Sequence, residues 1–201
     1  MQSPRIEPRP IEGLTDEMWQ TLGQIPGDGL KSEGFPRNVL GTLLHNPEVL
    51  GPFLAYWVKS KHALSLSVRE QELVILRMGS LFDCEYVWKH HVLVGREFGI
   101  TDDELAALRA CPRAFARGPA ASMSAREVAL VALTDELVEA RTIGEDAWSR
   151  FGLRLEERNV VDLISLVSQY TLFALVNNGA RVLVEAPLAS LPSVRMFSSE
   201  W

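Results

Sequence analysis

The stretch DCEYVWKHHV, at residues 83–92, gathers the side chains of this chain that are most capable of chemistry. It contains one of the two cysteines and two of the four histidines. At about 100° per residue along a helix, Cys84, Trp88 and His91 lie on one stripe. His90 points roughly 120° away from Cys84, so we do not expect it to share a site with the cysteine.

Cys84 is the candidate nucleophile of this stripe. We expect it at or near the first position of a helix, where unpaired backbone N–H groups and the helix dipole favour a thiolate. A thiol with a low pKa is nucleophilic near neutral pH, although the negative charge of Glu85 opposes this effect. His91 lies two turns further on, about 10 Å along the axis, so a water or a third side chain would have to connect it to Cys84.

The preceding helix supplies a carboxylate. Glu72 shares a helix face with apolar residues and Gly79, and a carboxylate in such surroundings needs a partner or a proton. A helical hairpin that closes at Asp83 would bring Glu72 beside His91, because each lies about two turns from the bend. We therefore predict an acid–base relay from Glu72 through His91 to Cys84. Gly79 would let another backbone approach closely.

Purely structural interpretations of the same residues stay open. A single cysteine in a helix is often a small buried apolar side chain, and a single histidine on an apolar face is often a core residue. Glu72 could equally form a structural ion pair with Arg77 or Arg96. These two arginines are also the nearest candidates to bind a substrate carboxylate, and both are expected to face solvent.

A metal site is disfavoured, and no cofactor is expected. Glu72, Cys84, His90 and His91 are residue types that bind metals. However, the adjacent histidines point to different faces, and the chain has no cysteine pair or His-x₃-His spacing that would be typical of a zinc site.

The elements that must position these residues are predicted to be helices. Ser67 and Glu70 form a capping box that opens a helix to about Leu81, and a second helix begins near Cys84 and ends at Gly99. The long apolar run from Glu156 is predicted to stop at the sequence Asn-Asn-Gly, residues 177–179. No segment alternates with a period of two, so the predicted fold is all-α. Another helix is expected to begin at Thr15, and others are expected at 37–44, 46–61, 101–109, 124–140 and 144–151.

The predicted organisation is one multi-helix domain. Residues 1–13 are an extended arm rich in proline, residues 14–186 form the helical domain, and residues 187–201 form an irregular tail. The segments 67–82 and 124–139 share a Ser-x-Arg-Glu start followed by an apolar run. This likeness indicates either an internal duplication of a helical hairpin or convergent capping chemistry.

Composition excludes several classes of partner. The chain has 201 residues, 47% apolar residues and a net charge of −6, without a basic cluster. An acidic surface argues against nucleic acid or an anionic membrane as a partner. There is no run of 18 apolar residues and no secretory signal pattern. Two cysteines, Cys84 and Cys111, do not make a disulfide framework, which favours a cytoplasmic location.

The segment 67–108 resembles the carboxymuconolactone decarboxylase-like family, which includes alkylhydroperoxidase D. The resemblance implies an all-helical, usually oligomeric protein. The peroxidase motif of that family, Glu-x₁₁-Cys-x₂-Cys-x₃-His, corresponds here to Glu72, Cys84, Val87 and His91. Val87 stands where that motif has its second cysteine. A sulfenic acid on Cys84 would therefore need an external thiol reductant, Cys111 or a second subunit to resolve it.

Three functions follow as hypotheses. The first is thiol-dependent peroxide reduction, with Cys84 as the nucleophile and with His91 and Glu72 as the proton relay. The second is a cofactor-free lyase or decarboxylase that acts on a lactone of aromatic-compound degradation through His91 and Glu72. The third is a non-catalytic homo-oligomer that binds a small ligand. The expected pocket residues are Trp88, Val87 and Tyr86.

Overall fold

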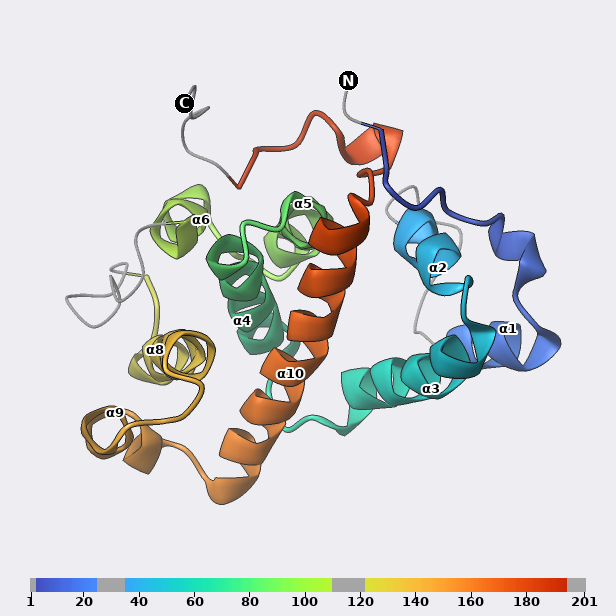
Figure 1. Cartoon of the computed structure of the whole chain (residues 1–201). Helices are drawn as coiled ribbons and strands as arrows, with labels where there is room; N and C mark the ends of the chain where they lie inside the picture. Colours follow the sequence, from blue (N-terminus) through green and yellow to red (C-terminus); the bar gives the residue numbers. More distant parts are fainter. Residues whose placement is uncertain (1–2, 25–34, 110–121, 195–201) are drawn as a thin grey trace. The chain divides into compact units, whose positions relative to one another are not determined.

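The part of the protein that the structure describes is built from helices joined by turns and loops. The computed structural model describes residues 3–24, 35–109 and 122–194, and within these ranges it contains helices and no strand (Figure 1). The predicted all-α fold is confirmed. The α-helices are α1 (Asp16–Leu22), α2 (Arg37–Leu43), α3 (Pro47–Ala63), α4 (Val68–Leu81), α5 (Glu85–Glu97), α6 (Asp102–Arg109), α8 (Ala125–Glu139), α9 (Glu145–Arg150) and α10 (Glu157–Ala180). Short 3₁₀ helices are η1 (Ile11–Gly13), η3 (Gly152–Arg154) and η4 (Ala186–Leu188).

The chain folds into two compact units. One unit contains residues 65–174 together with 192–194, and therefore α4, α5, α6, α8, α9 and most of α10. The other contains α1, α2 and α3 with residues 175–191. The predicted boundaries after residues 13 and 186 stay predictions. Cys111 and most of the loop predicted between residues 112 and 123 lie outside the described residues.

The N-terminal arm belongs to the second of these units and is held by backbone contacts. The amide of Arg9 donates to the carbonyl of Gly41 in α2 at 3.0 Å. A Cβ on Gly41 would lie 2.3 Å from the Arg9 carbonyl oxygen, so only glycine permits this approach. Arg5 donates its amide to the carbonyl of Ala180 at 2.8 Å, which ties the arm to the end of α10.

Helices α4 and α5 form the hairpin that the sequence predicts. α4 ends at Leu81 with Phe82 as its C-cap, and Asp83 turns the chain with a φ of 49°. The amide of Cys84 then donates to the Gly79 carbonyl at 2.8 Å. A Cβ on Gly79 would lie 3.2 Å from the backbone nitrogen of Trp88 and 3.3 Å from its Cα. The predicted close backbone approach at Gly79 is therefore present.

The two Ser-x-Arg-Glu segments open α4 and α8 with the same capping box. The hydroxyl of Ser67 accepts the amide of Glu70, and the Glu70 carboxylate accepts the amide of Ser67 at 2.7 Å. Ser124 and Glu127 repeat both bonds at the start of α8. Each box pairs two backbone donors that would otherwise be unsatisfied at a helix start, which explains why both boundaries are predictable.

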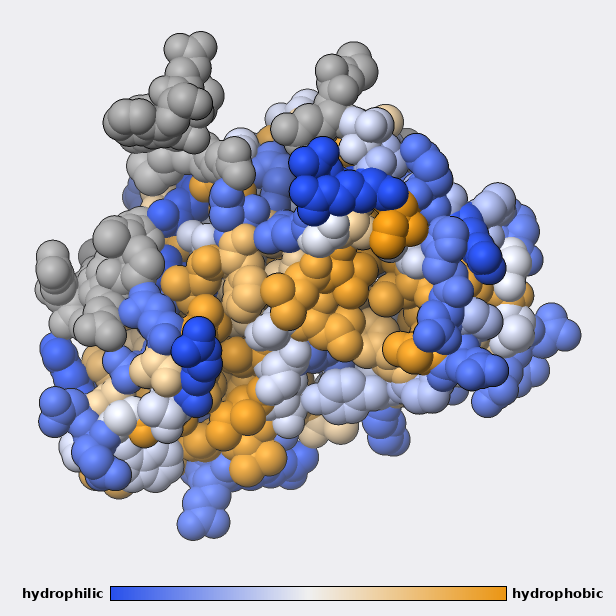
Figure 2. All heavy atoms as spheres, viewed as in Figure 1, coloured by the Kyte–Doolittle hydropathy of each residue, from blue (hydrophilic) through white to orange (hydrophobic). Residues whose placement is uncertain are grey.

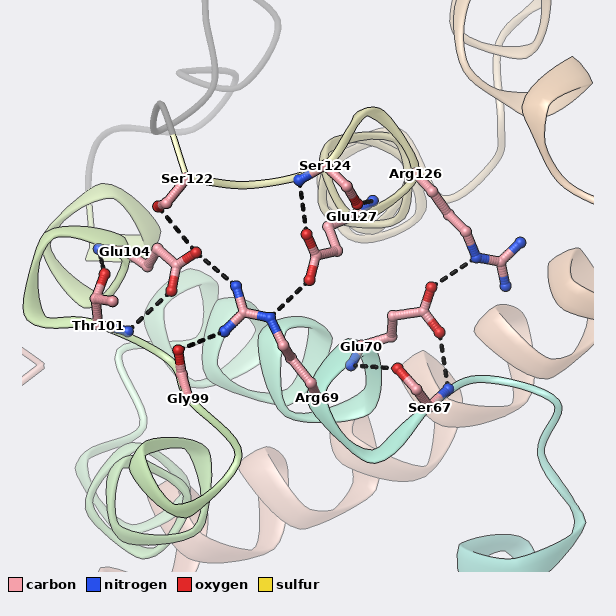
Figure 3. Close-up of polar contacts among 10 residues, drawn as sticks. All are labelled: Ser67, Arg69, Glu70, Gly99, Thr101, Glu104, Ser122, Ser124, Arg126 and Glu127. Atoms are coloured by element: carbon pink, nitrogen blue, oxygen red, sulfur yellow. Dashed lines mark hydrogen bonds and ion pairs between the residues drawn. The ribbon is translucent and has the colours of Figure 1, made fainter.

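The arginines of these segments connect the two helices reciprocally (Figure 3). Arg69 of α4 donates from Nε to Glu127 of α8 at 2.7 Å, and Arg126 of α8 donates from Nε to Glu70 of α4 at 2.6 Å. Arg69 also donates to Glu104 of α6 at 2.6 Å. Burial opposes the ionised form of Glu104, yet the bonds from Arg69 and its other donors hold the pKa of that carboxyl below its ordinary value. This reciprocity is what duplication of one helical hairpin would produce.

A buried ion pair joins α4 to α8 deeper in the core. Arg77 donates from Nε and Nη2 to the two carboxylate oxygens of Asp135, at 2.6 and 3.0 Å, and from Nη1 to the Leu108 carbonyl at 2.7 Å. Arg77 is fully buried, so the expectation that it faces solvent is wrong. Three charge-assisted bonds compensate the guanidinium for the water it loses. Glu72 is not its carboxylate partner.

Helix α10 carries apolar side chains on more than one face. Figure 2 shows apolar side chains gathered over it, and Val161, Ile164 and Leu172 are exposed. Among the described helices it alone is long and apolar enough to span a membrane by length and composition, a test that core helices also pass, and half of its most apolar window is buried.

The predicted stop at residues 177–179 is wrong, because α10 continues to Ala180. It ends where Arg181 adopts a φ of 53° and the amide of Val182 donates to the Asn177 carbonyl at 2.9 Å. The left-handed residue and this bond close the helix, so the Asn-Asn-Gly sequence lies within the last turn.

The buried ion pair should contribute strongly to stability. We expect Asp135→Ala to lower the free energy of unfolding in urea by about 3–5 kcal/mol, because it leaves the Arg77 charge buried without its partner. The exposed pair Arg96–Asp102, at 2.8 Å, is the control, and Arg96→Ala should cost about 0–1 kcal/mol. Equal losses from the two substitutions would contradict this assignment.

Candidate active site

His91 is the centre of the candidate site. Its Nδ1 lies 2.7 Å from Oε2 of Glu72, which reaches it from α4. The Glu72 side chain is 6% exposed and that of His91 is 14% exposed. The α4–α5 hairpin thus brings together the two residues that the sequence predicts to meet. An ionised carboxylate only accepts hydrogen bonds, so Nδ1 carries the proton and donates it to Glu72.

Tyr170 of α10 is the second partner of His91, and sequence reasoning missed it. Its hydroxyl lies 3.2 Å from Nε2 of His91, across 79 positions of the chain. The two rings meet edge to face with centroids 5.2 Å apart. The only signal in the sequence is a tyrosine on a mostly apolar helix, and that pattern says nothing about which distant side chain its hydroxyl meets.

Cys84 does not have the environment expected of a reactive thiol. It is the N-cap residue of α5, and it is fully buried. Burial raises the pKa of Cys84 to about 11. The nearby backbone amides of Val87 and Tyr86 oppose that shift in the pKa, whereas the charges of Asp83 and Glu85 add to it. The expectation of a low thiol pKa is therefore wrong, because desolvation outweighs the helix terminus.

The three predicted pocket residues follow Cys84 within four positions of the sequence, and all three are buried. Trp88 is fully enclosed and donates its indole N–H to the Pro192 carbonyl at 3.0 Å. Tyr86 stacks on His90 with ring centroids 4.4 Å apart. Val87 is buried as well. A role for Trp88, Val87 and Tyr86 in a substrate pocket stays a prediction.

Neither Arg77 nor Arg96 forms a hydrogen bond with Glu72 or His91 in the described part of the chain. Arg77 is bonded to Asp135, as described above, and the exposed Arg96 donates to Asp102. Within residues 3–24, 35–109 and 122–194, no three histidine, cysteine, aspartate or glutamate side chains are grouped closely enough to hold a metal ion. The chemistry that this arrangement can support is proton transfer by a histidine held between a carboxylate and a phenol.

Comparison with protein families identifies this region. Residues 47–130 match the model of the Carboxymuconolactone decarboxylase family. The match includes Glu72, Cys84 and His91. No curated protein matches the sequence of the chain. The family resemblance predicted from residues 67–108 is confirmed.

Solved structures share the fold. An uncharacterized peroxidase-related protein from Ralstonia eutropha JMP134, described as an alkylhydroperoxidase AhpD core, is 16% identical with a TM-score of 0.72, and the alignment covers 94% of this chain and 95% of that one. A peroxidase-related protein from Silicibacter sp. TM1040 is 17% identical with a TM-score of 0.71, covering 97% and 100%. At these identities the likeness shows the fold alone.

A third structure with the same fold is an enzyme. It is a cysteine-to-alanine variant of the debrominase Bmp8 in complex with 2,3,4-tribromopyrrole. It is 13% identical to this chain with a TM-score of 0.66, and the alignment covers 94% of this chain and 95% of that one. This chain therefore shares its fold with a debrominase as well as with peroxidase-related proteins.

The buried state of Cys84 can be tested by alkylation. In a Cys111→Ser variant, only Cys84 remains to react. With a pKa of about 11, about one-thousandth of it would be thiolate at pH 8. We expect iodoacetamide to label the native protein at least about 100-fold more slowly than the urea-unfolded protein. Rapid native labelling with a midpoint below pH 7 would show a reactive thiol instead.

Proposed function

We propose that this chain is a cofactor-free enzyme that transfers protons on a small organic molecule, with His91 as the acid–base group. The observation that carries this proposal is the difference in access between the two candidate groups. The His91 side chain is 14% exposed and is hydrogen-bonded to a buried carboxylate, whereas Cys84 is fully buried. Part of the His91 side chain therefore lies at the protein surface, whereas the thiol of Cys84 does not.

The pairing with Glu72 suits His91 for both directions of proton transfer. The carboxylate fixes the ring orientation and the tautomer with the proton on Nδ1. When the ring gains a second proton, the Glu72 charge at 2.7 Å stabilises the imidazolium. Because Glu72 is largely removed from water, that stabilisation is stronger than it would be at the surface.

The substrate class that we propose is a small carboxylated lactone, as the family name indicates. Loss of carbon dioxide from such a molecule leaves an electron pair on carbon, and a proton must replace the departed carboxyl group. An imidazolium at His91 would deliver that proton and return to the neutral ring. The reaction is redox-neutral and needs no metal or external reductant.

Thiol-dependent peroxide reduction is the second candidate, and one observation favours it. Cys84 is the N-cap residue of the 13-residue helix α5, close to the backbone amides of Val87 and Tyr86, and a helix start stabilises a thiolate if the site opens. Burial and the raised pKa of Cys84 oppose it in the present conformation. An external thiol would have to reduce the oxidised cysteine, because Val87 cannot form a disulfide.

Substitutions at His91 and Cys84 separate the two candidates. With γ-carboxymuconolactone as the substrate, we expect His91→Ala to lower kcat for decarboxylation by about 100-fold or more, because the proton donor is lost. Glu72→Gln should also lower kcat, and Cys84→Ser should stay within about twofold of the wild type. Decarboxylation is followed by release of carbon dioxide.

His90→Ala is the matched control, since His90 is adjacent in sequence and contacts Tyr86 rather than Glu72. Peroxide consumption in the presence of dithiothreitol is measured on the same variants. If decarboxylation survives His91→Ala, or if only peroxide is consumed and Cys84→Ser abolishes this, the acid–base proposal is wrong. If the wild type turns over neither substrate, the non-catalytic alternative is favoured.

A further inference from the structure

The exposed positions of α10 form one narrow stripe. Between residues 161 and 175 these positions are Val161, Ile164, Ser168, Leu172 and Leu175. At about 100° per residue they fall within an arc of about 80°, over a length of about 21 Å. Because all five belong to one continuous helix, α10 alone sets their spacing. The stripe is therefore a single surface feature, and Figure 2 shows apolar side chains gathered over this helix.

None of the five side chains of the stripe is charged, and four of them are apolar. The exposed fractions are 61% for Val161, 41% for Ile164, 37% for Leu172 and 61% for Leu175. A surface helix ordinarily carries charged or polar residues on the side that faces away from its core. Contiguous apolar residues on that side mark a face that contacts another molecule.

The spacing of the stripe is the same in both directions along the helix. Ser168 lies at its centre, with Ile164 and Leu172 four residues to either side. Val161 and Leu175 lie seven residues to either side. A two-fold axis at Ser168 would place Ile164 of one copy opposite Leu172 of another when the helices run antiparallel. The intervals of 3, 4, 4 and 3 residues differ from the alternating intervals of a parallel coiled coil.

The small side chain at the centre suits the close approach of two helices. Packed helices have axes about 8–10 Å apart, and the distance depends on the side chains at the contact. Ser168 would meet its own copy at this point, and the larger apolar side chains on either side would pack around it. Size and spacing together make the stripe complementary to itself.

Charge also favours a second copy over other partners. The net charge of −6 makes two copies repel one another in general, but the stripe brings no like charges together. Helices that lie on anionic membranes carry lysine and arginine beside their apolar face. Between residues 161 and 180, α10 contains neither residue type.

We propose that a second copy of this chain covers the stripe, with the two α10 helices packed antiparallel about a two-fold axis at Ser168. Both copies then bury the same residues, as an isologous interface requires. Tyr170, which contacts His91, points about 200° away from Ser168 around the helix. The proposed contact is therefore separate from the proposed acid–base function, and each can fail without the other.

Sedimentation equilibrium tests the interface. Because a contact centred on one helix face is small, we expect a dimer with a Kd in the micromolar range. Ser168→Arg should raise this Kd at least about 100-fold, since each new charge would face its own copy. Leu153→Arg, at a 73% exposed position outside the stripe, is the control and should keep the wild-type Kd. Circular dichroism checks that both variants keep their helices.

Cysteine cross-linking tests the antiparallel direction in a Cys111→Ser background, in which the remaining native thiol, Cys84, is buried. Ile164→Cys and Leu172→Cys proteins, mixed and oxidised, should form the mixed dimer in preference to either homodimer, because only opposed cysteines are close enough for a disulfide. Ser168→Cys should cross-link to its own copy. If Ile164→Cys and Leu172→Cys each cross-link only with themselves, the helices are parallel and the proposal is wrong.

The remaining outcomes identify other occupants of the stripe. A chain that stays monomeric up to about 0.5 mM would overturn the proposal. Such a monomer would bind lipid through the stripe if it co-sediments with phosphatidylcholine vesicles and Ser168→Arg abolishes this, and a different protein would be the partner if it does not. A dimer that survives Ser168→Arg unchanged uses another surface, which also overturns the proposal.

Discussion

The close approach of α4 and α5 at Gly79 is the constraint on which the candidate site depends. Where a side chain would stand on Gly79, the backbone of Trp88 lies 3.2 Å away. A larger residue would push the two helices apart, since the obstacle is backbone that cannot rotate aside. The separation of these helices sets the 2.7 Å distance between Glu72 and His91, which face each other across the same hairpin.

The position of α4 is in turn determined by charge. The guanidinium of Arg77 is buried against Asp135 of α8, and at the start of the helix Arg69 bonds to Glu127 while Arg126 bonds to Glu70. Such pairs are directional, so they specify how α4 lies against α8 as well as contributing to stability. The helix that carries Glu72 is therefore held at both its N-terminal end and its centre.

Burial decides which of the candidate groups is suited to chemistry in this conformation. The same hairpin encloses Cys84 completely and leaves part of the His91 side chain exposed. Loss of water raises the pKa of a thiol and suppresses its nucleophilic form, even at a helix N-terminus. The imidazole of His91, by contrast, has a carboxylate partner within the protein, Glu72, at 2.7 Å.

The sequence by itself determined the local structure of the helix ends and the pairing of Glu72 with His91. The capping boxes at Ser67 and Ser124 and the turn at Asp83 depend on residues within a few positions of each other. Glu72 and His91 are 19 positions apart, but they lie on consecutive helices joined by one tight turn, so helical spacing predicts that they meet. The resemblance to the carboxymuconolactone decarboxylase family likewise followed from one contiguous segment. The tertiary structure alone decided that Tyr170 meets His91 and that Arg77 is buried, because these contacts join helices far apart in sequence. It also decided how deeply Cys84 is buried. The sequence pattern predicts this thiol at a helix start, but only the packing of several elements determines how much water it loses.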